Sequence, residues 1–248
     1  MCNLLHQLPV EKIFLIQSAE PSLLEKFADE EHESKKNAAV ILDQVTQKLQ
    51  KAAGPNTHVK YAISDFPLLR AIHQAINSLD PDLLIAGSDS EGDESPIGDE
   101  IITISKSSPV PVLVIPSGCR YEPVKKALLP CNFADLSSLT LLEGLTPLES
   151  VQLKLLNVDP DNDFANQRSE IEQSISELLL DYKHDFNYST NEDIVEGILE
   201  FFNNNNIQLV IALPGKRSFF YRLTHTSISQ ALTQNSAKPV LLLKDDEN

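Results

Sequence analysis

The chain has 248 residues, of which 42% are hydrophobic and 23% charged, a composition typical of one large or two ordinary folded domains. Its formal net charge of −16 argues against nucleic acid and membrane surfaces as partners, because both repel an acidic protein. We expect a cytoplasmic protein, since the sequence has neither an apolar run of 18 residues nor a signal peptide over residues 1–20.

In the first half, short apolar runs alternate with helical patterns. Residues 13–16 form an apolar run that predicts a strand, and a long helical pattern follows over residues 31–52. Apolar positions at helical spacing over residues 68–76 lead into a second apolar run at 82–86. The half closes on a strand at 110–114, so helix and buried strand follow each other along the chain.

A stretch rich in turn residues, Gly118–Pro123, directly precedes a new predicted strand at 125–130. We therefore predict two domains, residues 1–119 and residues 120–248.

The second half repeats the alternation and adds one strand at its start. Its predicted strands cover about 125–130, 151–158, 184–189, 207–212 and 239–243, with helical patterns between them, one of them over 164–182. Near-continuous apolar strands separated by amphipathic helices predict a doubly wound α/β fold with a parallel sheet.

The two halves match at nearly constant offsets. Asp82–Ala86 matches Gln208–Ala212 at an offset of 126 (208 − 82), and Pro111–Val114 matches Pro239–Leu242 at 128 (239 − 111). Such internal similarity predicts two tandem copies of one domain.

The first copy lacks the opening strand of the pattern. Ile13–Ile16 matches Leu153–Leu156 at an offset of 140 (153 − 13), which places Met1 opposite Leu141. In the strand order 3-2-1-4-5 the opening strand is central, so its loss breaks the sheet. Either the two flanking strands pair directly, or another strand or chain takes the position, or the gene starts further upstream.

The pattern resembles the universal stress protein family over nearly the whole chain. The opening strand Lys126–Phe133 ends in Asn132 where the family has an aspartate, and Leu84–Ser88 resembles the end of the family's fourth strand. Ser108–Val114 and Ala237–Leu242 resemble its closing strand. The resemblance implies a role in stress response, an adenine nucleotide held after the fourth strand, and a dimer contact through the closing strand.

The glycine motif of nucleotide-binding members, G-x2-G-x9-G followed by Ser or Thr, is degenerate in both copies. Gly87, Gly92 and Gly98 have the wrong spacing and stand among six carboxylates, and the second copy keeps only Gly215. Because backbone N–H groups of this loop cradle phosphates, we predict that ATP binding is lost or weakened.

One basic segment follows the predicted strand at 207–212. Open α/β sheets bind ligands beyond the carboxyl ends of their strands, so this position is that of a ligand site. The candidate nucleotide- or anion-binding residues are Asn132, Gly215, Lys216, Arg217, Ser218, His225 and Ser227. The alternative is a solvated loop whose aromatic residues, Phe219–Tyr221, pack against the neighbouring copy.

No catalytic or metal site is predicted. His225 and Ser227 have no acid placed to orient the imidazole, the remaining histidines lack ligand spacing, and the three cysteines have no CxxC spacing.

We therefore predict a non-enzymatic universal stress protein without a cofactor, acting through binding or protein interaction. The alternative is a sensor of ATP or AMP, or a weak ATPase, that uses the second domain. Val110–Val114 and Val240–Leu243 are predicted to pair as an intramolecular pseudo-dimer, and a homodimer and an unknown protein partner stay open.

Overall fold

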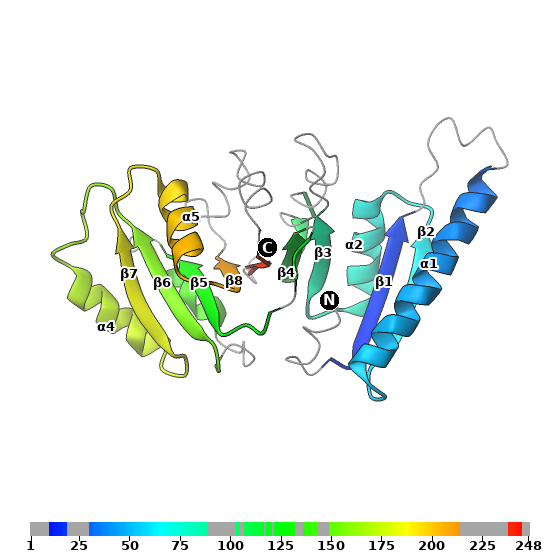
Figure 1. Ribbon diagram of the computed structural model, residues 1–248, viewed down its shortest axis with the longest axis horizontal. Helices are drawn as coiled ribbons and strands as arrows, with labels where there is room; N and C mark the ends of the chain where they lie inside the picture. Colours follow the sequence, from blue (N-terminus) through cyan, green and yellow to red (C-terminus); the bar gives the residue numbers. More distant parts are fainter. Residues whose placement is uncertain are drawn as a thin grey trace. The chain divides into compact units, whose positions relative to one another are not determined.

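The computed structural model of the 248-residue chain describes residues 10–18, 30–88, 103–104, 107–116, 118–120, 122–131, 136–142, 149–213 and 238–244. They form an α/β structure with mainly parallel strands (Figure 1). The chain divides into two compact units, Met1–Pro81 and Asp82–Asn248.

The N-terminal unit contains two strands and two helices, β1 (Lys12–Ser18), α1 (Glu30–Ala53), β2 (His58–Ser64) and α2 (Leu68–Leu79). The strands pair in parallel, from Lys12 opposite His58 to Ser18 opposite Ser64. α1 contacts β2 and α2 contacts β1. The buried side chains of this unit's helices are Leu42, Leu49, Ala71, Ile72 and Ile76.

The limits of α2 follow from its flanking prolines and one left-handed residue. Pro67 precedes the first helical residue, where its missing N–H costs no helical hydrogen bond. At the other end Asp80 takes a positive φ of 46° and donates its N–H to the Ile76 carbonyl at 3.0 Å. Pro81 cannot continue the helix, so the chain leaves toward the next strand.

The C-terminal unit is built on a seven-stranded sheet in the order β3-β4-β9-β8-β5-β6-β7. The strands are β3 (Leu84–Ser88), β4 (Val112–Pro116), β5 (Lys126–Pro130), β6 (Gln152–Val158), β7 (His184–Ser189), β8 (Leu209–Ala212) and β9 (Val240–Leu242). Its helices include η3 (Ser137–Leu142), α4 (Arg168–Leu178) and α5 (Ile194–Asn204). All neighbouring strands are parallel except β4 and β9, which pair antiparallel with Leu113 opposite Leu241.

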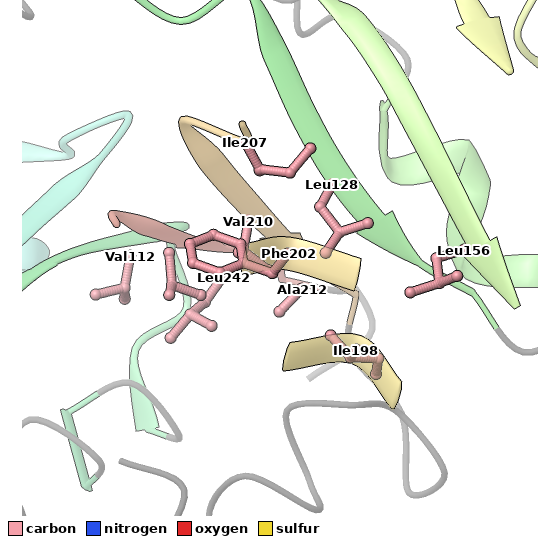
Figure 2. Packing of buried hydrophobic residues seen from close by; sticks show 10 residues of the cluster. Val112, Leu128, Leu156, Ile198, Phe202, Ile207, Val210, Ala212 and Leu242 are labelled. Atoms are coloured by element: carbon pink, nitrogen blue, oxygen red, sulfur yellow. The ribbon is translucent and has the colours of Figure 1, made fainter. Parts of the chain in front are cut away.

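The core of this unit lies between α5 and the middle strands (Figure 2). Ile198 and Phe202 of α5 pack with Leu128, Leu156 and the apolar residues of β4, β8 and β9. β5 is the most deeply buried strand, since Ala127, Leu128 and Leu129 are 0% exposed. Each such leucine contributes about 1.5–3 kcal/mol of burial free energy, so β5 anchors the sheet.

Strand alternation separates the two faces of this sheet. Leu156 packs toward α5, and a Cβ on Gly197 of α5 would lie 3.1 Å from Val158. The alternating residues Leu155 and Asn157 therefore face the opposite side of the sheet.

The predicted strand order 3-2-1-4-5 is confirmed for the second half, where it reads β7-β6-β5-β8-β9. The elements β1, α1, β2, α2, β3 and β4 recur in order as β6, α4, β7, α5, β8 and β9. The recurrence extends to hydrogen bonds: Leu84 N–H donates to Pro111 C=O at 2.9 Å, and Val210 N–H to Pro239 C=O at 3.0 Å.

The described part of the first half has no counterpart of β5, and β1 and β3, which would flank it, belong to different sheets. The direct pairing of these two strands, one of the alternatives above, is thus not formed among the described residues. The compact units divide after Pro81, because β3 and β4 join the C-terminal sheet through the pairing of β4 with β9. The boundary predicted from the sequence lies between residues 119 and 120.

The helix predicted over 164–182 is shorter, Arg168–Leu178. Residues 159–167 form turns instead, because the Asp159 carboxylate accepts the N–H groups of Asp163 and Phe164. Across the described segments, every helix is too short or too polar to traverse a bilayer.

Candidate functional site

The predicted site residues lie outside the described part of the chain. These are Asn132, Gly215, Lys216, Arg217, Ser218, His225 and Ser227. The residues that precede them are described: Cys131 follows β5, Leu213 follows β8, and these two strands are parallel neighbours. Both predicted segments therefore leave the sheet from adjacent strands at the same edge.

That edge is formed by the carboxyl ends of β9, β8, β5, β6 and β7, which run parallel to one another. Polar side chains follow three of these ends: Lys244 after β9, Asn157 and Asp159 at β6, and Ser189 at β7. Half-burial of Lys244 lowers the pKa of its ammonium group. Ligands of open α/β sheets bind outside such an edge, so this is the candidate site of the described residues.

Asn157 is the deepest polar group at this edge, with 4% of its surface exposed. Its Nδ2 donates to the Cys131 carbonyl at 3.1 Å, whereas its Oδ1 is buried and has no donor among the described residues. A buried acceptor without a donor costs about 1–3 kcal/mol.

Tyr188, Arg168 and Glu172 form a second polar group, which we call the Tyr188 cluster. The Tyr188 hydroxyl donates to Glu172 Oε1, and the Arg168 guanidinium carbon lies 4.2 Å from the centre of the Tyr188 ring. Arg168 Nη2 donates to Asn162 Oδ1 at 2.7 Å, but Arg168 Nε is buried and has no acceptor in the described part of the chain.

The Tyr188 cluster lies beside Asn157, because Asn157 and Tyr188 are register partners on β6 and β7. Cβ atoms of such partners are about 5 Å apart. An unpartnered acceptor on Asn157 and an unpartnered donor on Arg168 thus flank one aromatic ring.

Asp159 fixes the loop that brings Arg168 to the cluster. Its carboxylate, 7% exposed, accepts the N–H of Asp163 at 3.1 Å and that of Phe164 at 3.0 Å. The chain then turns into α4, whose first residue is Arg168.

The titratable groups near the edge are held in unreactive forms. Burial raises the pKa of the Cys131 thiol to about 12, which keeps it protonated. Burial and the hydrogen bond to Glu172 raise the pKa of Tyr188, so the phenol stays a donor. At the opposite end of β7, His184 has both ring nitrogens engaged, Nδ1 with the Tyr182 carbonyl at 2.9 Å and Nε2 with Ser176 Oγ at 3.1 Å.

No three histidine, cysteine or carboxylate side chains of the described segments come together as metal ligands.

The sequence prediction missed Asn157, Arg168 and Tyr188. Asn157 did leave a signal, because a lone amide interrupts the otherwise apolar run Leu155–Val158. The contact of Arg168 with Tyr188 left none, since it depends on the turn fixed by Asp159.

Two solved structures are similar to this chain over almost its whole length. A universal stress protein from Archaeoglobus fulgidus matches with a TM-score of 0.69 and 17% identity, over 98% of this chain and 89% of that one. A functionally unknown protein from Pseudomonas aeruginosa matches with a TM-score of 0.55 and 13% identity, over 98% and 95%.

No protein-family model matches the sequence, and no curated protein matches it. The likeness is therefore one of structure, and it covers both sheets. On these findings the chain has the universal stress protein fold.

Proposed function

We propose that this chain is a non-enzymatic protein of the cellular stress response, made of two copies of the universal stress protein fold and acting by binding. The fold supports the stress-related role. The observation that carries binding is the pair of unpartnered buried atoms, Asn157 Oδ1 and Arg168 Nε, at the carboxyl edge of the sheet.

The state of the nearby groups supports a non-enzymatic role. Catalysis by a nucleophile or base requires a group whose pKa lies near the working pH. The pKa of the Cys131 thiol and that of the Tyr188 phenol are instead both raised, which favours their inert protonated forms.

The charge at the edge supports weak nucleotide binding. Asp159 lies at the end of β6, and the chain as a whole carries a net charge of −16. A polyphosphate is repelled by this field, whereas a neutral group with a donor and an acceptor is not. Together with the degenerate glycine motif, this favours a small neutral ligand over ATP.

A second candidate function is an adenine-nucleotide sensor or weak ATPase that uses the second copy. The half-buried cation Lys244 at the same edge favours it, as does the position of the basic segment from Lys216 to His225 directly after β8. Phosphate oxygens are the natural partners of such cations.

The antiparallel pairing of β4 with β9 supports a pseudo-dimer of the two copies through Val110–Val114 and Val240–Leu243. A homodimer of the whole chain and a cytoplasmic location belong to the same proposal.

Isothermal titration with adenosine, AMP and ATP, each with and without Mg²⁺, tests the binding mode. We expect no heat with ATP or AMP. Micromolar ATP binding, about −8 kcal/mol, that disappears in a Lys216→Ala, Arg217→Ala double variant would establish the nucleotide sensor instead. A Lys48→Ala, Lys51→Ala double variant in α1 is the matched control, because it removes the same charge far along the sequence.

A further inference from the structure

The strand β1 has one edge that no other described strand covers (Figure 1). The carbonyl of Glu11 accepts the His58 N–H at 2.8 Å, so Glu11, Ile13, Leu15 and Gln17 direct their backbone groups toward β2. The backbone groups of Lys12, Phe14, Ile16 and Ser18 therefore point to the open edge.

The counterpart of β1 in the second half, β6, has this edge filled by β5. Gln152 N–H donates to Lys125 C=O and Cys131 N–H donates to Leu156 C=O, both at 2.9 Å. The offset of 140 places Lys12, Phe14 and Ile16 of β1 opposite Gln152, Lys154 and Leu156 of β6. The same backbone groups that hold β5 in one half are thus unpaired with any described strand in the other.

Side-chain burial differs in the same sense. Leu153, Leu155 and Leu156 of β6 are at most 1% exposed, whereas no residue of β1 is buried and Phe14 is 39% exposed. In the C-terminal unit, all four residues of β8 are buried, whereas residues 84–87 of its counterpart β3 are half-buried or exposed. Each of the two strands lacks the cover that its counterpart receives.

Nothing in β1 protects this edge. Edge strands are commonly blunted by proline, by bulges or by charges in the middle of the strand. Residues 13–17 contain neither proline nor charge, and a two-stranded sheet is marginally stable by itself. An added strand would satisfy the open backbone groups and cover Phe14.

We propose that the open edge of β1 binds an extended apolar segment of another polypeptide as an added parallel strand. Its chemistry is that of β5, which fills the equivalent place: two lysines followed by small and aliphatic residues, Lys125–Leu129. A basic flank also suits a chain with a net charge of −16. Unfolded proteins expose segments of this kind, so the proposal rests on the proposed role in stress response and names its partner class.

A second copy of this chain does not supply the strand in its folded state. Its own β5 is fully buried between β6 and β8, and releasing it would dissolve that sheet. The segment therefore comes from a chain that is itself unfolded.

Fluorescence anisotropy of a labelled peptide with the sequence of residues 124–131, VKKALLPC carrying serine in place of the cysteine, tests the proposal with the full chain. Alternate residues of β5 face β6, among them Lys125 and Cys131, and therefore Ala127 and Leu129. N-methylation at Ala127 and Leu129 should weaken binding at least tenfold, whereas N-methylation at Leu128, which faces away, should leave it within threefold.

Variants of β1 give the matching test on the protein. Phe14→Pro removes an N–H of the open edge and leaves the β1–β2 hydrogen bonds in place. Phe14→Ala removes only the side chain. We expect Phe14→Pro to bind the peptide at least tenfold more weakly than Phe14→Ala.

The proposal is overturned if the parent peptide does not bind, or if both N-methylated peptides bind equally well. It is also overturned if the chain forms a dimer that protects the Phe14 and Ile16 N–H groups from hydrogen exchange, and if this protection is lost when the protein is diluted. If Phe14→Pro does not fold, the peptide pair still decides. Ligand titration at the carboxyl edge is independent of Phe14, so failure here is distinguishable from failure of the proposed binding function.

Discussion

Gly197 illustrates how one missing methyl group sets the fit between α5 and the sheet. A Cβ at this position would lie 3.1 Å from each of Asn191 Cβ, Ser189 Oγ and Val158 Cγ1. Gly197→Ala gains about 1 kcal/mol of helix propensity, but overpacking costs about 1–3 kcal/mol. We expect a net loss of stability in urea denaturation.

Gly87→Ala in β3 is the matched control, because a Cβ there meets no atom within 4 Å. It should change the free energy of unfolding by less than about 0.5 kcal/mol. Equal stability of the two variants would show that α5 can shift away from the sheet.

The buried thiol of Cys131 predicts a pH dependence. Its pKa is about 12 in the folded chain, against a model-peptide value of 9.0. Between these pH values the unfolded chain has released the proton that the folded chain keeps, so stability falls as pH rises through this window.

Wild type should therefore lose on the order of 1 kcal/mol more than Cys131→Ala when urea denaturation is compared at pH 8 and pH 10. Equal losses in the two proteins would mean that the thiol is solvated in the folded state.

Residue-scale chemistry was the part of this protein least open to prediction from sequence. Cys131 is buried, and this burial raises the pKa of its thiol. Asn157 and Tyr188, by contrast, meet only through the register of β6 and β7. Register is a property of paired strands, and no local pattern in either strand specifies it.

At the scale of elements, Gln50 joins the end of α1 to the start of β2. Its Nε2 donates to the carbonyls of Gly54 at 3.0 Å and Thr57 at 2.7 Å, and its Oε1 accepts the Val59 N–H at 3.3 Å. Gln50→Leu leaves these backbone groups without partners, and we expect it to destabilise the N-terminal unit by about 1–3 kcal/mol.

Hydrogen exchange of the β2 amides is the measurement, because it reports on this unit alone. Gln47→Leu, an exposed position of the same helix, is the control and should leave exchange unchanged. Equal exchange in both variants would show that apolar packing, and not the Gln50 hydrogen bonds, holds the end of α1 to the start of β2.

Strands were predicted more accurately than helix ends. Apolar runs marked β6 and β5 within two residues, because burial on both faces leaves a nearly unbroken apolar signature. α4 was placed too early, since the Asp159 carboxylate holds the preceding turn through two backbone N–H groups. Side-chain capping of this kind competes with helix formation and is invisible in hydrophobic periodicity.

At the scale of the whole molecule, the net charge of −16 predicts a salt dependence of stability. Like charges repel more strongly in the compact state, and the screening length falls to about 10 Å at 0.1 M salt. We expect the melting temperature to rise when NaCl is raised from about 20 mM to about 200 mM.

KCl should act equally, because screening depends on ionic strength and not on the ion. A melting temperature that falls with salt would show that attractive ion pairs such as Lys154–Asp185 outweigh the repulsion.

The overall architecture followed from the sequence because the internal repeat, the alternation of elements and the opening strand of the second half agree with one another. Which compact unit receives β3 and β4 did not follow. That choice depends on the pairing of β4 with β9, two strands that lie far apart in the chain.

β9 also sets the order in which the C-terminal sheet can be completed during synthesis. Its three residues, Val240–Leu242, come after all other described strands in the sequence, yet they lie between β4 and β8 inside the sheet. A nascent chain that has not yet released residue 242 from the ribosome holds β4 and β8 with unpaired edges. The sheet therefore closes only when β9 pairs with β4, a contact between residues far apart in the sequence. Such a step is slow and leaves a period in which the chain can misassemble.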